Sequence, residues 1–329
     1  MLVIRLQALG DVVVTLPFAR ALRQRFPGSE LDFLTRVEVA EAVKAVSFLD
    51  RVYVLGGGRS ERRQLAVSGG LILRLLRRRY DVVVDLQNTR LSRWLRGWLR
   101  VGAWSAFDRV SPLSAGERTW RTIEAAGLGL GEVRPGFPLK DPERGVAKLR
   151  REGWAPGEEL VVLNPAGAFP SRHWPVAHYA GFARLWRARR PARFLLMGLP
   201  GVRARSDALK RAIGEHAIDL VGRTDVAEAL ALIRRARLVV SEDSGLMHMA
   251  WVSGVPTIAL FGSSRSDWGR PLGHGVCLDS RDLPCGTCLA AECRYGDVHC
   301  LTRYSPERVA EEAETLLARA ATQDAVLCG

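Results

Sequence analysis

Short apolar runs alternate with amphipathic helical patterns through most of this 329-residue chain. An apolar run that leads into a helical stretch, repeated many times, is typical of β-α units and predicts parallel sheets. Several runs are apolar at every position, which indicates strands that helices cover on both faces. The expected strands are residues 2–6, 30–35, 51–55, 81–86, 160–165, 193–198, 218–222, 238–243 and 256–262.

The order of these elements predicts two doubly wound α/β domains in series. A chain of this length is typical of two domains, and the proline-containing stretch 135–158 is the expected boundary. We expect a first domain at 1–150, a second at 151–305 and a last helix at 306–320. Parallel sheets bind ligands beyond the carboxyl ends of their strands, so the turns that follow the strands are the expected site.

The net charge of +13 is concentrated in the first half of the chain. Residues 1–155 have a balance of +11 and residues 156–329 one of +2, and segment 59–100 holds 11 Arg but 3 acidic residues. This asymmetry predicts an anionic partner for the first half: a nucleic acid, a phosphorylated lipid or a membrane surface. The sequence has no run of eighteen apolar residues and no secretory pattern, so a cytoplasmic location is expected.

Part of this basic segment, residues 90–100, mixes Arg with Leu and Trp at helical spacing. Trp94 and Trp98 are one turn apart, and Arg93 and Arg96 lie between and beside them. Such a helix can lie at a lipid interface, or it can be a domain helix that buries its Trp residues and exposes its Arg residues. We expect the second arrangement for the Trp residues, while the Arg cluster favours an anionic ligand.

The turn after the first strand carries Gly10 and Asp11. The helical pattern that follows opens with Val12–Val14 and contains Pro17, and these residues are poor helix openers. Local rules tend to be broken at functional sites. Asp11 is either a helix N-cap or a general base that takes a proton from a hydroxyl nucleophile.

The turn after the expected strand 238–243 carries Asp243, Ser244 and Gly245. Asp and Ser are good N-cap residues, and the free N–H groups of a helix N-terminus suit a phosphate. His248 follows one turn later on the same side of the helix. The alternative is an ordinary cap with a packed histidine.

Arg172 follows the expected strand 160–165. Its planar guanidinium can bind a diphosphate, or it can be a surface residue beside a Trp that packs at the domain boundary. The chain has no G-x-G-x-x-G after a strand and no G-x-x-x-x-G-K-[ST] motif, so neither a classical dinucleotide site nor a P-loop is expected.

Four cysteines within sixteen residues give the spacing C-x2-C-x4-C-x6-C, and Cys277 and Cys328 lie outside this group. The four are Cys285, Cys288, Cys293 and Cys300. They can bind structural zinc, form disulfides or remain free thiols. Metal is not favoured because a second C-x2-C is missing, and a structural role is expected in each case.

Four stretches then occur in one order along the chain: RLQALGDVVVTLP, NPAGAFPSRHWPVAHYAGFARLW, LVGRTDVAEALALIRRARLVVSEDSGLMHMAWVSGVPTIALFG and CGTCLAAECRYGDVHCL. Together they resemble glycosyltransferase family 9, the ADP-heptose:lipopolysaccharide heptosyltransferases. The resemblance implies a GT-B fold, with two Rossmann-like domains facing a cleft. It also implies that the first domain binds the acceptor, that the second binds the nucleotide-sugar, and that the last helix packs back on the first domain.

The resemblance implies an inverting glycosyltransferase that requires no metal or other cofactor for its chemistry. Asp11 takes the position of the catalytic base, Arg172 that of a residue binding the diphosphate, and Asp243 that of an acid holding donor sugar hydroxyls. The other residues implied at the donor are Ser244 and Gly245 at the phosphate, His248 on the same helix, and Gly222, Arg223 and Thr224 near the nucleoside.

One stretch departs from the family. The family has an acid that contacts the ribose after the strand at 193–198, whereas this chain has Val202 and Arg203 near that place, so nucleotide recognition is expected to differ. Charge and resemblance together imply an anionic lipopolysaccharide-core glycolipid as acceptor, with Arg62, Arg63 and Arg93 on its side. They also imply peripheral contact with the inner face of the cytoplasmic membrane and no nucleic-acid partner.

Two other functions stay open at this point. A GT-B sugar-nucleotide epimerase would need no acceptor. A nucleotide- or nucleic-acid-binding module would use the basic half without transferase activity, although the sequence contains no recognisable nucleic-acid fold.

Overall fold

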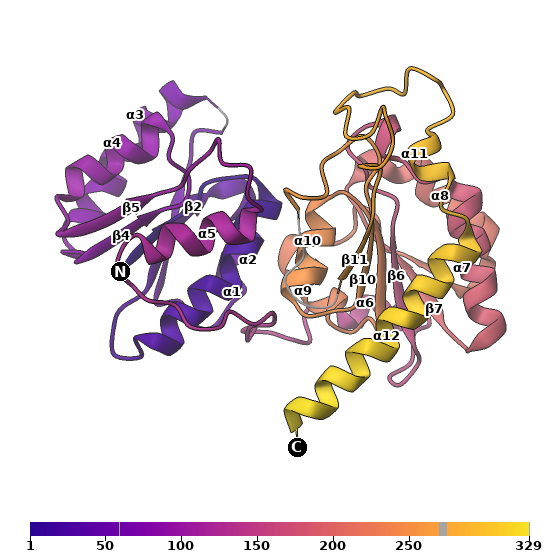
Figure 1. Ribbon diagram of the computed structural model, residues 1–329. Helices are drawn as coiled ribbons and strands as arrows, with labels where there is room; N and C mark the ends of the chain where they lie inside the picture. Colours follow the sequence, from indigo (N-terminus) through magenta and orange to yellow (C-terminus); the bar gives the residue numbers. More distant parts are fainter. Residues whose placement is uncertain (59, 270–274, 329) are drawn as a thin grey trace. The chain divides into compact units, whose positions relative to one another are not determined.

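The computed structural model describes residues 1–58, 60–269 and 275–328, without the side chains of Glu61 and of residues 323–328. The chain forms two compact units, Met1–Asp141 and Pro142–Gly329. Each unit is a parallel sheet with helices on both faces (Figure 1). This confirms the expected pair of doubly wound α/β domains, and the division falls inside the stretch 135–158.

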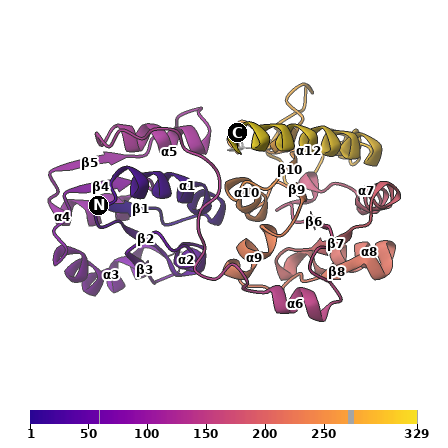
Figure 2. The same cartoon turned by 90° about the horizontal axis from the view of Figure 1, so that it is seen from below.

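The first unit contains a five-stranded sheet in the order β3-β2-β1-β4-β5, and all its pairings are parallel. The strands are β1 (Leu2–Ile4), β2 (Asp32–Arg36), β3 (Arg51–Leu55), β4 (Val82–Asp85) and β5 (Ala103–Ala106). The helices are α1 (Leu9–Arg25), α2 (Ala40–Lys44), α3 (Glu61–Leu76), α4 (Arg90–Leu99) and α5 (Ala115–Glu124). Helices α3 and α4 cover one face of the sheet, and α1, α2 and α5 cover the other (Figure 2).

The second unit contains a six-stranded parallel sheet in the order β11-β10-β9-β6-β7-β8. The strands are β6 (Leu160–Asn164), β7 (Arg193–Leu196), β8 (Ala217–Asp219), β9 (Leu238–Glu242), β10 (Thr257–Leu260) and β11 (Gly275–Leu278). The helices are α6 (Val146–Arg151), α7 (Val176–Arg189), α8 (Arg203–Ile213), α9 (Val226–Ile233), α10 (Gly245–Val252), α11 (His299–Thr302) and α12 (Pro306–Cys328).

Alternation along the strands divides the second core between the two faces of the sheet. Ile258 and Leu260 pack on the side of α7, α8 and α12, whereas Ala259 and Phe261 pack with Trp251 of α10. Successive side chains of a strand point to opposite faces, so a run that is apolar at every position supplies both cores. This is why the continuous apolar runs located the strands correctly.

The opening of α1 shows how burial overrides local propensity. Val12, Val13 and Val14 are all buried, and Pro17 lies inside the helix. Fully burying such side chains contributes about 1.5–3 kcal/mol each, which exceeds a propensity cost of less than about 1 kcal/mol per β-branched residue. The helix therefore forms because its face packs on the sheet.

The last helix, α12, begins as expected. The Arg308 N–H donates to Ser305 Oγ at 3.3 Å, and Pro306 occupies the first helical position. Within its own unit α12 lies against α7, β10 and β11, and its packing on the first domain remains a prediction. Along the described residues no helix is both long and apolar enough to cross a bilayer.

Candidate active site

The strand order reverses between β6 and β9 in the second sheet, which are neighbours although β7 and β8 separate them in the chain. In open α/β sheets, ligands bind outside the carboxyl ends of the strands at such a point. The residues at these two ends are Asn164, the last residue of β6, and Glu242, the last residue of β9, followed by Asp243 and Ser244. The reversal therefore brings together the two turns that the sequence singled out.

Arg172 and Asp243 form an ion pair at this place. Arg172 Nη1 lies 3.1 Å from Asp243 Oδ2, and both side chains are largely buried. The guanidinium lies 5.3 Å from the ring centre of Phe169, which is 41% exposed. Arg172 is thus not the free surface residue of the alternative interpretation.

Ser244 is the N-cap of α10, since its Oγ accepts from Met247 N at 3.4 Å. Asn164 Nδ2 donates to Ser244 Oγ at 2.6 Å and to Ser241 Oγ at 2.8 Å. Asn164 Oδ1 is buried and has no hydrogen-bond partner among the described residues. Gly245 is the first residue of α10, so the N-terminus of this helix faces the same polar group of side chains.

The side chain of Glu242 connects the segments that form this site through hydrogen bonds. Its Oε2 accepts from Gly167 N at 2.6 Å, its Oε1 accepts from Trp174 N at 2.8 Å, and Arg205 of α8 donates to each oxygen at 2.8 Å. A Cβ at Gly167 would lie 2.9 Å from Glu242 Oε2, so only glycine fits there. One fully buried carboxylate therefore joins the loop that carries Arg172 to β9 and α8.

Tyr179 adds a second buried hydrogen bond at this site. Burial raises the pKa of its hydroxyl well above 10, and the negative charge of Glu242 adds to this shift. The hydroxyl therefore stays protonated and donates to Asn164 O at 3.2 Å.

The remaining donor-side candidates lie in two places. His248 is half-buried on α10, with its ring edge-on to Trp251 at 5.4 Å. Gly222, Arg223 and Thr224 form the turn between β8 and α9, where Gly222 has φ +67°. Arg223 pairs with Glu152 at 2.6 Å in this structure.

The departure at Val202 and Arg203 has a structural use. Val202 ends a short 3₁₀ turn, and Arg203, the first residue of α8, pairs with Asp219 at the end of β8 at 2.6 Å. Arg203 therefore links the start of α8 to the edge strand β8.

In the first unit, Asp11 lies beyond the carboxyl end of β1, where the strand order also reverses, between β1 and β4. The structure corrects its expected place in the helix: Ala8 is the N-cap and Asp11 is the third helical residue. Asp11 Oδ2 accepts from Ala8 N at 3.2 Å, and its Oδ1 pairs with Arg5 Nη2 at 2.8 Å. The carboxylate keeps 38% of its side-chain surface exposed.

Two arginines beside Asp11, Arg5 and Arg118, were not identified as candidate site residues from the sequence. Arg5 is buried, and its guanidinium lies 4.5 Å from the ring centre of Phe107, while Arg118 lies 4.8 Å from the same ring. Burial lowers the pKa of Arg118, and Arg5 adds to this shift whereas Asp11 opposes it. The signal that could have found Arg5 is a charged residue inside an apolar strand run, and Glu242 at the end of β9 gives the same signal.

The expected burial of Trp94 and Trp98 is wrong. They are 40% and 52% exposed on α4, and their rings pack edge-to-face at 6.2 Å. Arg96 takes the inward position instead, where it pairs with the buried Asp85 at 3.3 Å and stacks on Trp104 at 3.8 Å. A buried carboxylate thus attracts the arginine of this helix and leaves the tryptophans outside. Three acceptor-side candidates are also exposed on α3 and α4: Arg62, Arg63 and Arg93.

None of the five cysteines whose side chains are described, Cys277 among them, forms a disulfide. Four of them, Cys285, Cys288, Cys293 and Cys300, line one pocket. The disulfide alternative is therefore excluded for this group.

Comparison with known proteins agrees with this architecture. The family model "Glycosyltransferase family 9 (heptosyltransferase)" matches residues 117–299. Lipopolysaccharide heptosyltransferase 1 of Pseudomonas aeruginosa is 26% identical over 355 aligned positions, which cover 96% of this chain and 97% of the relative.

Solved structures show the same fold. A glycosyl transferase family 9 protein from Veillonella parvula superposes with a TM-score of 0.82 at 20% identity, over 97% of both chains. The ADP-heptose LPS heptosyltransferase II of E. coli gives 0.75 at 20% identity, over 97% of this chain and 98% of that one. The two parallel-sheet domains and these neighbours confirm the expected GT-B fold. With a family model matched over more than half of its length, the chain belongs to glycosyltransferase family 9, the heptosyltransferase family.

Proposed function

We propose that this chain is an inverting heptosyltransferase of lipopolysaccharide-core synthesis, which moves a heptose from a donor of ADP-heptose type to a hydroxyl of an anionic glycolipid. The observation that carries the proposal is the pair Arg172–Asp243 beside the N-terminus of α10. A guanidinium and free helix N–H groups are both ligands for a diphosphate. The relative from Pseudomonas aeruginosa is by name a lipopolysaccharide heptosyltransferase, which supports the sugar and the acceptor class.

On the donor side, Arg172 and the N-terminus of α10 would bind the diphosphate and balance its charge as it leaves. Asp243 would accept hydrogen bonds from sugar hydroxyls, and His248 would lie one turn further along α10. The turn Gly222–Thr224 would contact the nucleoside. This set of charges needs no metal ion for the chemical step.

On the acceptor side, Asp11 would take the proton of the attacking hydroxyl. The new bond forms between that oxygen and the anomeric carbon, and the bond from this carbon to the diphosphate oxygen breaks. Attack from the face opposite the leaving group inverts the configuration. Arg5 pairs with Asp11 at 2.8 Å and holds its carboxylate in one orientation.

Replacing Arg172 tests the donor site. We expect Arg172→Ala to weaken ADP binding by roughly 10- to 100-fold, because a hydrogen bond to a charged group contributes about 1.5–3 kcal/mol. Isothermal titration calorimetry with ADP measures this. The matched control is Arg187→Ala, which removes an exposed arginine from α7 in the same unit and should bind ADP as the parent does.

Two results would contradict the donor assignment. Equal ADP affinity in the parent and in Arg172→Ala would remove Arg172 from the site. Tighter binding of UDP or GDP than of ADP would show that the donor carries a nucleotide other than ADP. It would also implicate Arg203, where the sequence departs from the family.

Incubating the parent with ADP-heptose alone separates transfer from epimerisation, since an epimerised donor would favour the epimerase.

The first unit is proposed to contact an anionic membrane through the outer surface of α3 and α4. This surface exposes Trp94 and Trp98 together with Leu73, which is 61% exposed. Aromatic and aliphatic side chains among arginines are typical of a helix that lies in a lipid interface. The exposed Arg62 and Arg93 supply the complementary charge.

Removing the tryptophans tests this contact. We expect Trp94→Ser with Trp98→Ser to lower partitioning onto vesicles containing phosphatidylglycerol at least tenfold. Withdrawing even ~60 Å² of apolar surface from water at ~25 cal/mol per Å² is worth about 1.5 kcal/mol. Trp120→Ser is the control, because Trp120 is 41% exposed on α5 at the other face of the sheet. Equal partitioning of both variants, or equal binding to neutral vesicles, would contradict the proposal.

A further inference from the structure

The segment between β11 and α11 has no hydrophobic core of its own. From residue 281 to residue 300 every side chain is half-buried or exposed. The segment also forms no strand, and its first helix is α11 at His299. An irregular stretch of this length needs another source of order, since burial supplies too little to offset the entropy of fixing the chain.

A cluster of cysteines in this segment, called the thiol-rich group below, offers that source of order. Four cysteines and one histidine from this segment line a pocket of about 290 Å³, together with Ser171 and Ser263 from neighbouring loops. The four cysteines are Cys285, Cys288, Cys293 and Cys300, and the histidine is His299. They are free thiols. Thiolate and imidazole are the ligands that zinc takes in structural sites.

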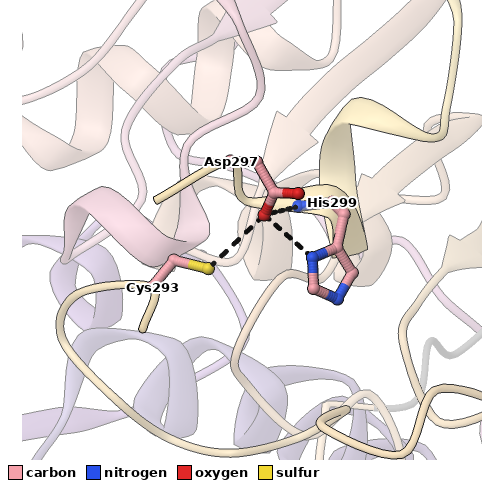
Figure 3. A group of neighbouring side chains, drawn as sticks. All are labelled: Cys293, Asp297 and His299. Atoms are coloured by element: carbon pink, nitrogen blue, oxygen red, sulfur yellow. Dashed lines mark hydrogen bonds and ion pairs between the residues drawn. The ribbon is translucent and has the colours of Figure 1, made fainter. Parts of the chain in front are cut away.

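The histidine is oriented as a metal ligand would be. His299 Nδ1 lies 2.8 Å from Asp297 Oδ1, and its Nε2 lies 3.0 Å from Cys285 Sγ. Cys293 Sγ lies 3.9 Å from the same carboxylate oxygen, and the ligand atoms of Cys293, Asp297 and His299 all fall within 4.8 Å of one another (Figure 3). A carboxylate on one ring nitrogen fixes the tautomer and turns the other nitrogen toward the metal.

The backbone is shaped around this group. A Cβ at Gly286 would lie 1.6 Å from Ser280 O, so the residue after Cys285 must be glycine. Thr287 and Leu289, on either side of Cys288, have φ of +55° and +58°. Side chains rarely adopt this left-handed region, which costs about 1–2 kcal/mol per residue. These turns aim the thiols at one pocket.

We propose that this segment is a structural metal site, in which Cys285 and Cys293, as thiolates, and His299 bind one zinc-type divalent ion. Soft sulfur donors in a tetrahedral arrangement select zinc or iron over calcium or magnesium. The fourth ligand is Cys300 or the exposed Cys288, and the experiment below assigns it. The ion takes the place of the missing core, as in small domains that fold around zinc.

The metal site would also position the loop that carries Arg172, a consequence that rests on the proposed function. Ser171 N donates to Ala291 O at 3.2 Å, and Leu289 N donates to Ser263 O at 2.8 Å. Ser171 Oγ also bonds Ser263 Oγ at 2.8 Å. Ser171 precedes Arg172, so the thiol-rich segment supports the loop that presents this arginine.

Metal analysis of the untagged chain tests the site without any assay of activity. We expect elemental analysis by mass spectrometry to find about one zinc or iron per chain, as a single tetrahedral site requires. Cys285→Ser, Cys293→Ser and His299→Asn should each lose it. Cys277→Ser is the matched control, because Cys277 lies on β11 outside the group, and it should retain the metal. Comparing Cys288→Ser with Cys300→Ser assigns the fourth ligand.

A second measurement covers variants that do not fold. The parent chain is stripped with a chelator and titrated with Co²⁺ alone, which should give thiolate-to-cobalt charge-transfer bands and the visible bands of a tetrahedral site. A metal-free parent that gives no such bands, and whose thiols react as fast as Cys277, would overturn the proposal. ADP binding separates the two proposals, since loss of Arg172 should weaken ADP binding while leaving the metal content unchanged.

Discussion

Replacing Asp11 by Asn should lower kcat/KM for sugar transfer by roughly two to four orders of magnitude, the usual contribution of a positioned general base. Asparagine keeps the size of the side chain and an oxygen that can accept from Ala8 N, but it cannot take a proton. Affinity for ADP should stay within about twofold of the parent, since the proposed diphosphate ligands lie in the other unit. Steady-state kinetics with donor and acceptor, together with calorimetry of ADP binding, measure both quantities.

The competing role of Asp11 predicts a different pattern. If its carboxylate serves only to hold the first turn of α1 through Ala8 N and Arg5, the cost appears as about 0.5–2 kcal/mol of unfolding free energy, with kcat almost unchanged. Asp81→Asn is the charge-matched control, because Asp81 is exposed at the amino end of β4. Full activity in Asp11→Asn would remove the residue from the catalytic proposal. Loss of activity with unchanged stability would support it.

Replacing Glu242 by Ala should destabilise the second unit by roughly 3–5 kcal/mol, the range for removing one partner of a buried ion pair. The change leaves the Arg205 guanidinium without its carboxylate and leaves Gly167 N and Trp174 N without their acceptor. An unpaired buried charge and two unsatisfied N–H groups together account for a cost of this size. Urea unfolding, with hydrogen exchange followed on peptides from β6 and β9, assigns the loss to the second unit.

A conservative variant and a surface pair serve as controls. Glu242→Gln should cost less, because an amide can still accept from one of the two N–H groups. Glu312→Ala should change the unfolding free energy by less than about 1 kcal/mol, since its pair with Arg308 lies along the surface of α12. A loss below about 1 kcal/mol in Glu242→Ala would show that Glu242 does not hold the loop to the sheet.

The sequence predicted every interior strand of the two sheets but missed two of the four edge strands. Runs of mainly apolar residues located the nine strands that were expected, because burial on both faces leaves few polar positions. The edge strands β5 (Ala103–Ala106) and β11 (Gly275–Leu278) were missed. These two strands are only partly buried, and AWSA and GVCL contain small or polar residues that weaken the signal.

The candidate site shows the same limit. The sequence singled out Arg172 and Asp243, and the structure brings them together because β6 and β9 are neighbours. It did not single out Glu242, whose partners come from distant parts of the chain, or Arg5, whose guanidinium packs on the distant Phe107. Nor could it place Trp94 correctly, because the inward position on α4 is decided by Asp85 at the end of another strand. Local pattern locates a turn, but tertiary pairing decides which side chain faces inward.

Each unit is built from one continuous stretch of chain, with the break between Asp141 and Pro142. Every strand of the first sheet therefore leaves the ribosome before any strand of the second. At synthesis rates of about 5–20 residues per second, the remaining chain takes roughly 10–40 s to appear, far longer than a small α/β domain needs to fold. The first unit can therefore bury its core before the strands of the second sheet have been synthesised. Errors in which strands of one sheet pair with strands of the other are thereby reduced by the order of synthesis.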